Sequence, residues 1–306
     1  MSNCEPTICM IPTEPPKVMD ESSREKIETK RTVEYFFSPS LKAFKNLAIE
    51  RLERGLGCTL FLEGPPGGGK TSFAKECARE LNAPMFYYSG APDKERDLLY
   101  EIDVSGVLRR ERAWIPGAAW QAFEQSRQGK NAVLLIDEVD KTNAGFDAFL
   151  LRLLEDWSFR SPDGTDVIGD PRHIMVILTS NGKRTLRPEV LRRAPRIMVP
   201  FPEQDRLLRI MDAVALTELP RNLVDIVVRL GDAIRTKDSQ LAPSPKELAL
   251  CCVDLISLRR HGVQDPEVWR QITASWLIKK GGAAVLDSIV KQYKWWRALM
   301  TEANRI

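Results

Sequence analysis

The chain has 306 residues, of which 43% are hydrophobic and 28% charged, which is enough to bury a core in one large domain or two modest ones. A formal net charge of +3 is close to balance, so it excludes the strong overall field of a protein that binds nucleic acid or a membrane surface through net charge. Six cysteines without a CxxC pair, and only two histidines, argue against a disulfide framework and a zinc cluster.

The first residues of the chain have the composition of a tail. Residues 1–33 combine several prolines with charge and contain few large apolar groups, so burial cannot offset the entropy of ordering them. We expect a disordered or linker tail there. The tail has no basic region followed by an apolar run, and nowhere in the chain do about 18 apolar residues stand together. These features predict a cytoplasmic protein without membrane contact.

After the tail, strand-like and helix-like segments alternate, which predicts an α/β fold with a mostly parallel five-stranded sheet. Beyond Pro202 the strand signal fades, so we expect an α/β domain over 34–202 and a smaller all-helical domain with a C-terminal helical extension over 203–306. The expected strands are 58–63, 85–89, 132–136, 174–179 and 197–199. The helices expected in the second domain are 203–217, 221–236, 245–259 and 283–300.

A glycine-rich motif between the first strand and the next helix fits GxxxxGK[ST] at every fixed position. In such a P-loop the backbone N–H groups surround a phosphate, and the following helix adds the positive end of its dipole. We expect Lys70 to meet the terminal phosphates and Thr71 to bind a bridging Mg²⁺ ion. The alternative, a glycine-rich turn with a chance lysine, fits the flanking strand and helix poorly. The residues expected to bind ATP here are Gly64, Pro65, Pro66, Gly67, Gly68, Gly69, Lys70, Thr71 and Ser72.

An acidic pair, Asp137 and Glu138, follows four aliphatic residues of an expected buried strand. Open parallel sheets place their chemistry at the carboxyl ends of strands. We expect Asp137 to hold Mg²⁺ together with Thr71, and Glu138 to polarise the water that attacks the terminal phosphate. Taken alone, such a pair can simply be solvated, but its position after a P-loop favours the functional interpretation.

These segments together resemble the nucleotide motifs of AAA+ ATPases, closest to the MoxR-like branch: GPPGGGKT, LLIDEVDK, and LTSN followed by LRPEVLRRAPRIMVPFP. By this resemblance Asn181 is the polar sensor that helps to position the lytic water. Arg192 and Arg193 lie where the family carries arginine fingers, which act on the ATP of a neighbouring subunit. By residue type alone the two arginines can be surface charge, and either can be the finger. The expected catalytic residues are Lys70, Glu138, Asn181, Arg192 and Arg193.

The segment around Lys246 resembles the start of the family's lid helix, which carries a second sensor that is usually arginine. Lysine can contact a phosphate as a point charge but lacks the bidentate fork, so this departure weakens the expected coupling of lid movement to hydrolysis. Ser244 is equally readable as a helix cap, with Pro245 at the first helical position. We expect Lys246 to contact nucleotide.

Three further segments bear on partners. Two insertions, over 91–117 and 157–172, resemble the MoxR-type pattern, and the second reads as a hairpin around an Asp-Gly turn. The first faces clients in related rings, although a plain surface loop is an equal alternative. The stretch 259–306 is basic and rich in aromatic residues, which is typical of a nucleic-acid surface, but helical spacing indicates that most of these aromatics pack.

The resemblance implies an ATPase that forms a ring with itself, as a hexamer, and remodels a protein client, for example one with a von Willebrand factor A domain. One alternative is a nucleic-acid-directed motor subunit of a restriction or defence assembly. Another is a nucleotide-gated scaffold, against which the complete set of catalytic residues argues.

Overall fold

The computed structural model describes residues 37–103, 114–237 and 241–279. The chain divides into two units, Met1–Glu34 and Tyr35–Ile306, and the described residues belong to the second. The tail expected at 1–33 and the helix expected at 283–300 lie outside the described residues. None of the helices in the described part is long and apolar enough to span a membrane.

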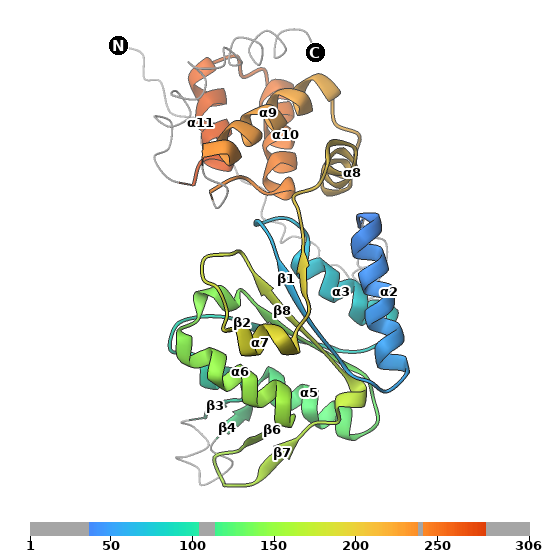
Figure 1. Cartoon of the computed structure of the whole chain (residues 1–306). Coiled ribbons are helices and arrows are strands. Elements are labelled where there is room, and N and C mark those ends of the chain that lie inside the picture. Colours follow the sequence, from blue (N-terminus) through green and yellow to red (C-terminus); the bar gives the residue numbers. More distant parts are fainter. Residues whose placement is uncertain (1–36, 104–113, 238–240, 280–306) are drawn as a thin grey trace, which may run out of the picture. The chain divides into compact units, whose positions relative to one another are not determined.

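Five parallel strands form the central sheet, in the order β2-β5-β8-β1-β9 (Figure 1). The expectation of a mostly parallel five-stranded sheet is therefore confirmed. The register pairs Glu63 with Ser180 and Ser89 with Asp137, so the carboxyl ends of four strands lie along the same edge. This edge is where an open parallel sheet places its chemistry. The strands are β1 Cys58–Glu63, β2 Met85–Ser89, β5 Ala132–Asp137, β8 Ile174–Ser180 and β9 Arg196–Met198.

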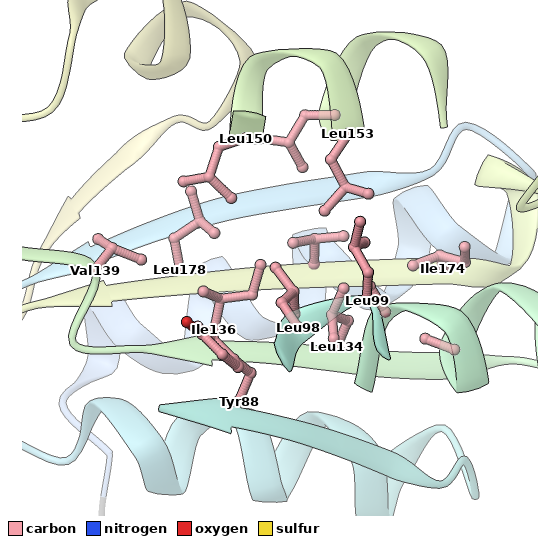
Figure 2. Close-up of a cluster of buried hydrophobic side chains, with 14 of the residues drawn as sticks. Tyr88, Leu98, Leu99, Leu134, Ile136, Val139, Leu150, Leu153, Ile174 and Leu178 are labelled. Carbon is pink, nitrogen blue, oxygen red and sulfur yellow. The ribbon is translucent and has the colours of Figure 1, made fainter. Parts of the chain in front are cut away.

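Helices cover both faces of the sheet, which explains why the central strands are aliphatic throughout. Leu134 and Ile136 of β5 belong to the cluster formed with α5 and α6, which Figure 2 shows in part. Val133 and Leu135, which alternate with these two residues along β5, belong to the cluster on the opposite face with α2 and α3. The alternation follows from the two-residue period of a strand. The helices are α2 Pro39–Glu53, α3 Lys70–Glu80, α5 Ala118–Arg127, α6 Ala144–Asp156 and α7 Pro188–Arg193.

Two hairpins extend from this core. The hairpin expected in the second insertion is present, because β6 Ser158–Arg160 pairs antiparallel with β7 Asp166–Ile168. Its turn contains Gly164 at φ 85°. For the first insertion, the sequence left a plain surface loop as an equal alternative. In the structure this insertion contains two paired antiparallel strands, β3 Tyr100–Ile102 and β4 Trp114–Pro116.

The helical part has its own core of buried side chains. Its helices are α8 Gln204–Ala215, α9 Arg221–Lys237, α10 Pro245–Arg260 and α11 Pro266–Leu277. Trp269 is buried and donates a hydrogen bond from its indole N–H to Val263 O at 2.9 Å. The indole of Trp276 donates to Asp254 Oδ2 at 2.7 Å. These two aromatic side chains therefore pack in the helical part, as their helical spacing indicated, while the domain boundary near residue 202 stays a prediction.

Candidate nucleotide-binding site

The P-loop between β1 and α3 has a backbone that only glycine fits at its ends. A Cβ on Gly64 would lie 2.0 Å from the carbonyl oxygen of Val199, closer than any real Cβ contact. Gly69, the residue before α3, has φ 101°, a region that side chains disfavour. The loop consequently leads directly into the N-terminus of α3, where unpaired backbone N–H groups and the helix dipole attract an anion.

Lys70 lies inside this loop, with only 7% of its surface exposed. Its ammonium group donates to Gly64 O at 2.7 Å, Pro65 O at 2.9 Å and Asn181 Oδ1 at 2.8 Å. Burial lowers the pKa of Lys70, and the carboxylates around it act in the opposite direction. The side chain thus joins the P-loop to the expected sensor.

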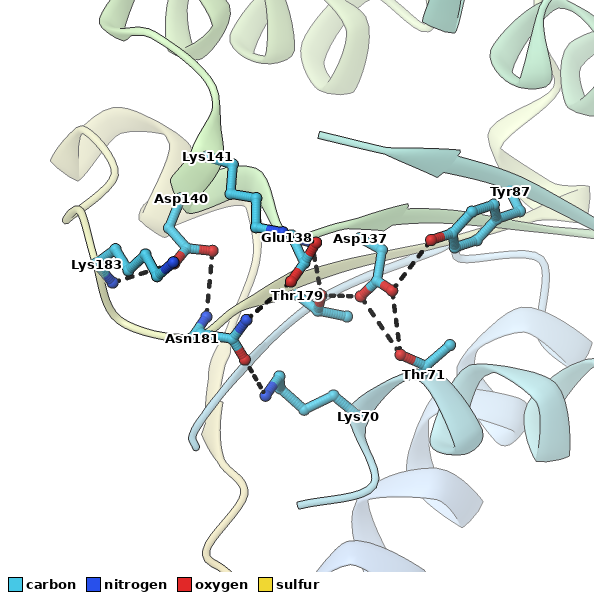
Figure 3. A network of polar contacts seen from close by, with 10 residues as sticks. All are labelled: Lys70, Thr71, Tyr87, Asp137, Glu138, Asp140, Lys141, Thr179, Asn181 and Lys183. Carbon is cyan, nitrogen blue, oxygen red and sulfur yellow. Dashed lines mark hydrogen bonds and ion pairs between the residues drawn. The ribbon is translucent and has the colours of Figure 1, made fainter. Parts of the chain in front are cut away.

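Asp137 lies at the end of β5, facing the start of α3 (Figure 3). The Thr71 hydroxyl donates to Asp137 Oδ2 at 3.1 Å, and the Thr179 hydroxyl on β8 donates to Oδ1. The Tyr87 hydroxyl is 3.5 Å from Oδ2. A carboxylate and a hydroxyl held side by side are hard oxygen donors of the kind that Mg²⁺ takes from proteins. The two residues expected to hold the metal are therefore adjacent.

Glu138 has a left-handed backbone, with φ 55° and ψ 45°. Its N–H donates to Thr179 Oγ1 at 2.9 Å, and its Oε1 accepts from Asn181 Nδ2 at 3.2 Å. Lys141 forms an ion pair with Oε2 at 2.5 Å. Strained backbone of this type clusters at functional sites. A continuous chain of contacts therefore runs from Lys70 through Asn181 to the carboxylate expected to activate water (Figure 3).

Comparisons with known proteins agree with this geometry. Residues 59–194 match the family "AAA domain (dynein-related subfamily)". This part of the chain is therefore similar to an AAA domain. The matched range includes most of the sheet, both acidic residues and Asn181, so the resemblance to AAA+ ATPases is confirmed at this level. Membership of the MoxR-like branch stays a prediction.

Curated proteins that are similar to this chain include Lon proteases. Lon protease 2 of Bdellovibrio bacteriovorus is 27% identical over 223 residues, which covers 67% of this chain and 27% of that protein. The Lon protease of Chlamydia pneumoniae is 32% identical over 154 residues, covering 48% of this chain and 18% of that protein. The chain thus spans about a quarter or less of the length of these relatives. Among solved structures, NtrX from Brucella abortus in complex with ATP matches with a TM-score of 0.43 and 19% identity, covering 76% of this chain and 51% of that chain.

The two arginines expected to act as fingers lie at the end of α7. Arg192 is exposed, and Arg193 forms an ion pair with Glu155 of α6 at 2.8 Å. The structure therefore does not bring either arginine into the hydrogen-bonded network around Lys70 and Asp137 that Figure 3 shows. Their expected role on a neighbouring subunit stays a prediction.

Lys246 occupies the first turn of α10 and is exposed. The cap expected at Ser244 is confirmed, because its hydroxyl accepts from Glu247 N–H at 3.3 Å while Glu247 Oε2 accepts from Ser244 N–H at 2.8 Å. A Cβ on Gly67 would lie 2.7 Å from Ser244 Cβ, so the cap packs against the P-loop. Lys246 lies two residues after Ser244 in the chain, and its contact with nucleotide stays a prediction.

Two site residues carry no obvious sequence signal. A Cβ on Gly90, directly after β2, would lie 2.5 Å from Glu138 O, and the Gly90 N–H donates to Asp137 O at 2.7 Å. Thr179 bonds both members of the acidic pair. Gly90 resembles any loop glycine, and Thr179 is the last residue of the expected strand 174–179, where its residue type alone does not single it out.

Proposed function

We propose that the protein is an ATPase that binds ATP with Mg²⁺ in the P-loop and hydrolyses it, acting as a MoxR-like ring oligomer that remodels a protein client. One observation carries the catalytic part of this proposal: Lys70, Asp137 and Asn181 converge at the carboxyl ends of adjacent parallel strands, within one hydrogen-bonded network. Three residues far apart in sequence meet there with the chemistry that phosphate transfer needs.

The P-loop supports phosphate binding. The Lys70 ammonium already has three oxygen acceptors in the loop and sensor. Phosphate oxygens can replace these carbonyl and amide acceptors, because they offer the same geometry with more negative charge. This exchange would also free Asn181 Oδ1, so phosphate contact with Lys70 reaches the sensor directly.

The oxygen pair of Thr71 and Asp137 supports a magnesium site. Mg²⁺ is usually held by one or two protein groups together with waters and phosphates, which matches two adjacent donors on the protein. When bound, the ion would neutralise charge on the phosphates and orient them. Thr179 holds the Asp137 carboxylate from the β8 side, through Oδ1, while Oδ2 is the oxygen nearer to the Thr71 hydroxyl.

Glu138 supports water activation. The left-handed turn and the bond to Thr179 aim its side chain at Asn181. A carboxylate in this position can accept a proton from an attacking water, while the Asn181 amide helps to orient that water. Lys141 lies on the other carboxylate oxygen and limits the rotation of the side chain.

The position of α7 supports the proposed ring. Arg192 and Arg193 lie at the end of a helix that starts seven residues after Asn181, outside the network around Lys70. We propose that they complete the site of a neighbouring copy, where arginines supplied in trans contribute on the order of 10³ to 10⁵ in rate in related phosphoryl-transfer systems. A protein with a von Willebrand factor A domain is the partner class that the MoxR-like resemblance suggests.

The test compares two substitutions. Lys70→Ala should abolish tight ATP binding, whereas Glu138→Gln should keep binding and lose turnover, since one residue contacts phosphate and the other activates water. Binding is measured with a fluorescent ATP analogue and turnover by phosphate release. ATP affinity at the wild-type level in Lys70→Ala protein would overturn the assignment. Pull-down with ATP-loaded Glu138→Gln protein identifies the client.

A further inference from the structure

Two buried carboxylates hold opposite ends of the loop that follows β8. Asp140, two residues after Glu138 in sequence, is 6% exposed and accepts from the N–H groups of Asn181 at 3.2 Å and Lys183 at 3.1 Å. Both N–H donors lie at the start of the loop that follows β8, and Figure 3 shows the two bonds. Asp140 therefore fixes the backbone of the sensor within its own subunit.

Asp147, in the first turn of α6, holds the other end of the same loop. It is 1% exposed. Its Oδ2 accepts from the Arg187 N–H at 2.9 Å. The Arg184 guanidinium donates to both carboxylate oxygens, at 2.9 and 2.8 Å. A two-pronged contact of this kind fixes orientation as well as distance.

Arg184 connects this anchor to the turn after the acidic pair. Its Nη2 also donates to Val139 O at 3.2 Å and to Thr142 Oγ1 at 3.1 Å. The guanidinium therefore joins three segments: the turn that carries Glu138, the start of α6 and the loop before α7.

The anchor matters because α7 is short. It has six residues, Pro188–Arg193, and its N-cap is Arg187, the residue whose N–H is bound by Asp147. A helix of this length does not hold its own position and depends on tertiary contacts. Those contacts include the buried Val190 side chain and the bond from the N-cap residue Arg187 to Asp147.

We propose that Arg184 and Asp147 are positioning residues that fix α7 so that its terminal arginines reach the nucleotide of the neighbouring subunit, while Asp140 positions Asn181 in its own site. The inference rests on the proposed function, because it assumes catalysis shared between copies of this chain. On this proposal, the start of the loop between β8 and α7 serves the subunit's own nucleotide, and the end of the loop serves the nucleotide of the neighbouring subunit.

The two roles are separated by mixing subunits. Arg184→Met protein alone should lose about a hundredfold in turnover, the effect expected when a catalytic group is displaced by about 1 Å. Its ATP affinity should stay within about threefold of wild type, because Lys70 and the P-loop are intact. Mixed with Lys70→Ala protein, it should regain at least a tenth of the lost activity, since the Lys70→Ala subunits supply a correctly placed α7 next to an intact P-loop.

Asp140→Asn protein gives the opposite expectation. Its defect lies in the subunit that hydrolyses ATP, so mixing with Lys70→Ala protein should leave turnover low. Recovery by the Asp140→Asn mixture to the same degree as the Arg184→Met mixture would overturn the division of roles.

A reference mixture keeps this inference distinct from the proposed function. Protein with both Arg192→Ala and Arg193→Ala, mixed with Lys70→Ala protein, should regain activity if the arginines act in trans. If this reference stays inactive while mixed rings form, the proposed function fails. If the reference recovers and the Arg184→Met mixture does not, the positioning role of Arg184 is wrong.

Two further variants control for folding. Arg221→Met removes another bidentate arginine–aspartate pair, with Asp212 at 2.7 and 3.2 Å, in the helical part. It should leave turnover unchanged. Arg184→Lys keeps the charge and loses the fork, so it should show a smaller loss of turnover with the same recovery on mixing. Thermal melting shows whether Arg184→Met protein folds. If it does not fold, the mixture of Arg184→Lys and Lys70→Ala proteins is used in its place, and a failure of that mixture to regain turnover overturns the proposal.

Discussion

The hydroxyl of Thr179 accepts a hydrogen bond from the backbone N–H of Glu138 at 2.9 Å. The same hydroxyl donates to the carboxylate of Asp137. One side chain on β8 therefore orients both members of the acidic pair on β5, and it does so from a fully buried position.

Thr179→Val should remove both bonds while keeping the shape of the side chain. An unsatisfied buried N–H costs about 1 to 3 kcal/mol, so the free energy of unfolding should fall by that order. Turnover should fall about tenfold or more, and the Mg²⁺ concentration needed for half-maximal rate should rise, because Asp137 loses its orientation. Titrating Mg²⁺ in a phosphate-release assay checks this. Thr179→Ser keeps the hydroxyl and should restore most of the activity; an equal defect in Thr179→Ser would contradict the explanation.

Gly90→Ala should impair catalysis through the backbone. The added Cβ would lie 2.5 Å from Glu138 O, so the turn carrying the carboxylate must shift. We expect turnover to fall about tenfold or more, as for other small displacements of a catalytic group, with ATP affinity little changed. The matched control is Gly129→Ala, where no atom lies within 4 Å of the added Cβ. Its only cost is backbone strain at φ 71°, so it should keep full turnover. Equal turnover in the two variants would count against this role of Gly90.

Ser244→Ala and Lys246→Ala should separate the two roles assigned to the start of α10. Loss of the cap at Ser244 should lower stability by about 0.5 to 2 kcal/mol. Lys246 is exposed, so its removal should leave the free energy of unfolding unchanged and lower turnover if it contacts phosphate. Chemical denaturation and steady-state kinetics on both variants provide the measurement. Unchanged kinetics in Lys246→Ala protein would remove it from the site.

Four buried cysteines should be unreactive in the folded protein. Burial raises the pKa of Cys58 to about 11 and the pKa values of Cys77 and Cys252 to about 12, and it raises that of Cys251 well above its ordinary value. The thiolate is the reactive form, so these thiols should react with a disulfide reagent at pH 8 about a hundredfold more slowly than in denaturant.

The raised pKa values of the buried thiols also make the free energy of unfolding depend on pH. The folded state keeps these thiols protonated above the unfolded value of 9.0, so stability should fall as pH rises from about 9 toward 11 or 12. A variant lacking Cys4 and Cys9 isolates the four thiols for counting. Rapid reaction of all four in the native protein would show that these sites open to solvent.

The strands and the central site could be predicted from sequence because their signals are local. The P-loop, the aliphatic run before Asp137, and the strand before Asn181 each show their residue types within eight positions or fewer. The contacts of Thr179 with Glu138 and of Arg184 with Asp147 could not be predicted in this way, since they join residues 41 and 37 positions apart. The β3–β4 hairpin was missed because each strand has three residues, too few for a periodic pattern, and the sequence between them has no Asp-Gly turn like the one that indicated the β6–β7 hairpin.

The left-handed conformation of Glu138 has a consequence for protein engineering. A residue with a Cβ in this conformation costs about 1 to 2 kcal/mol relative to right-handed backbone, and glycine or asparagine adopts it more readily. A screen that rewards thermal stability alone would therefore favour glycine or asparagine at position 138. Such a screen would enrich inactive proteins, because the residue that strains this turn is also the proposed base.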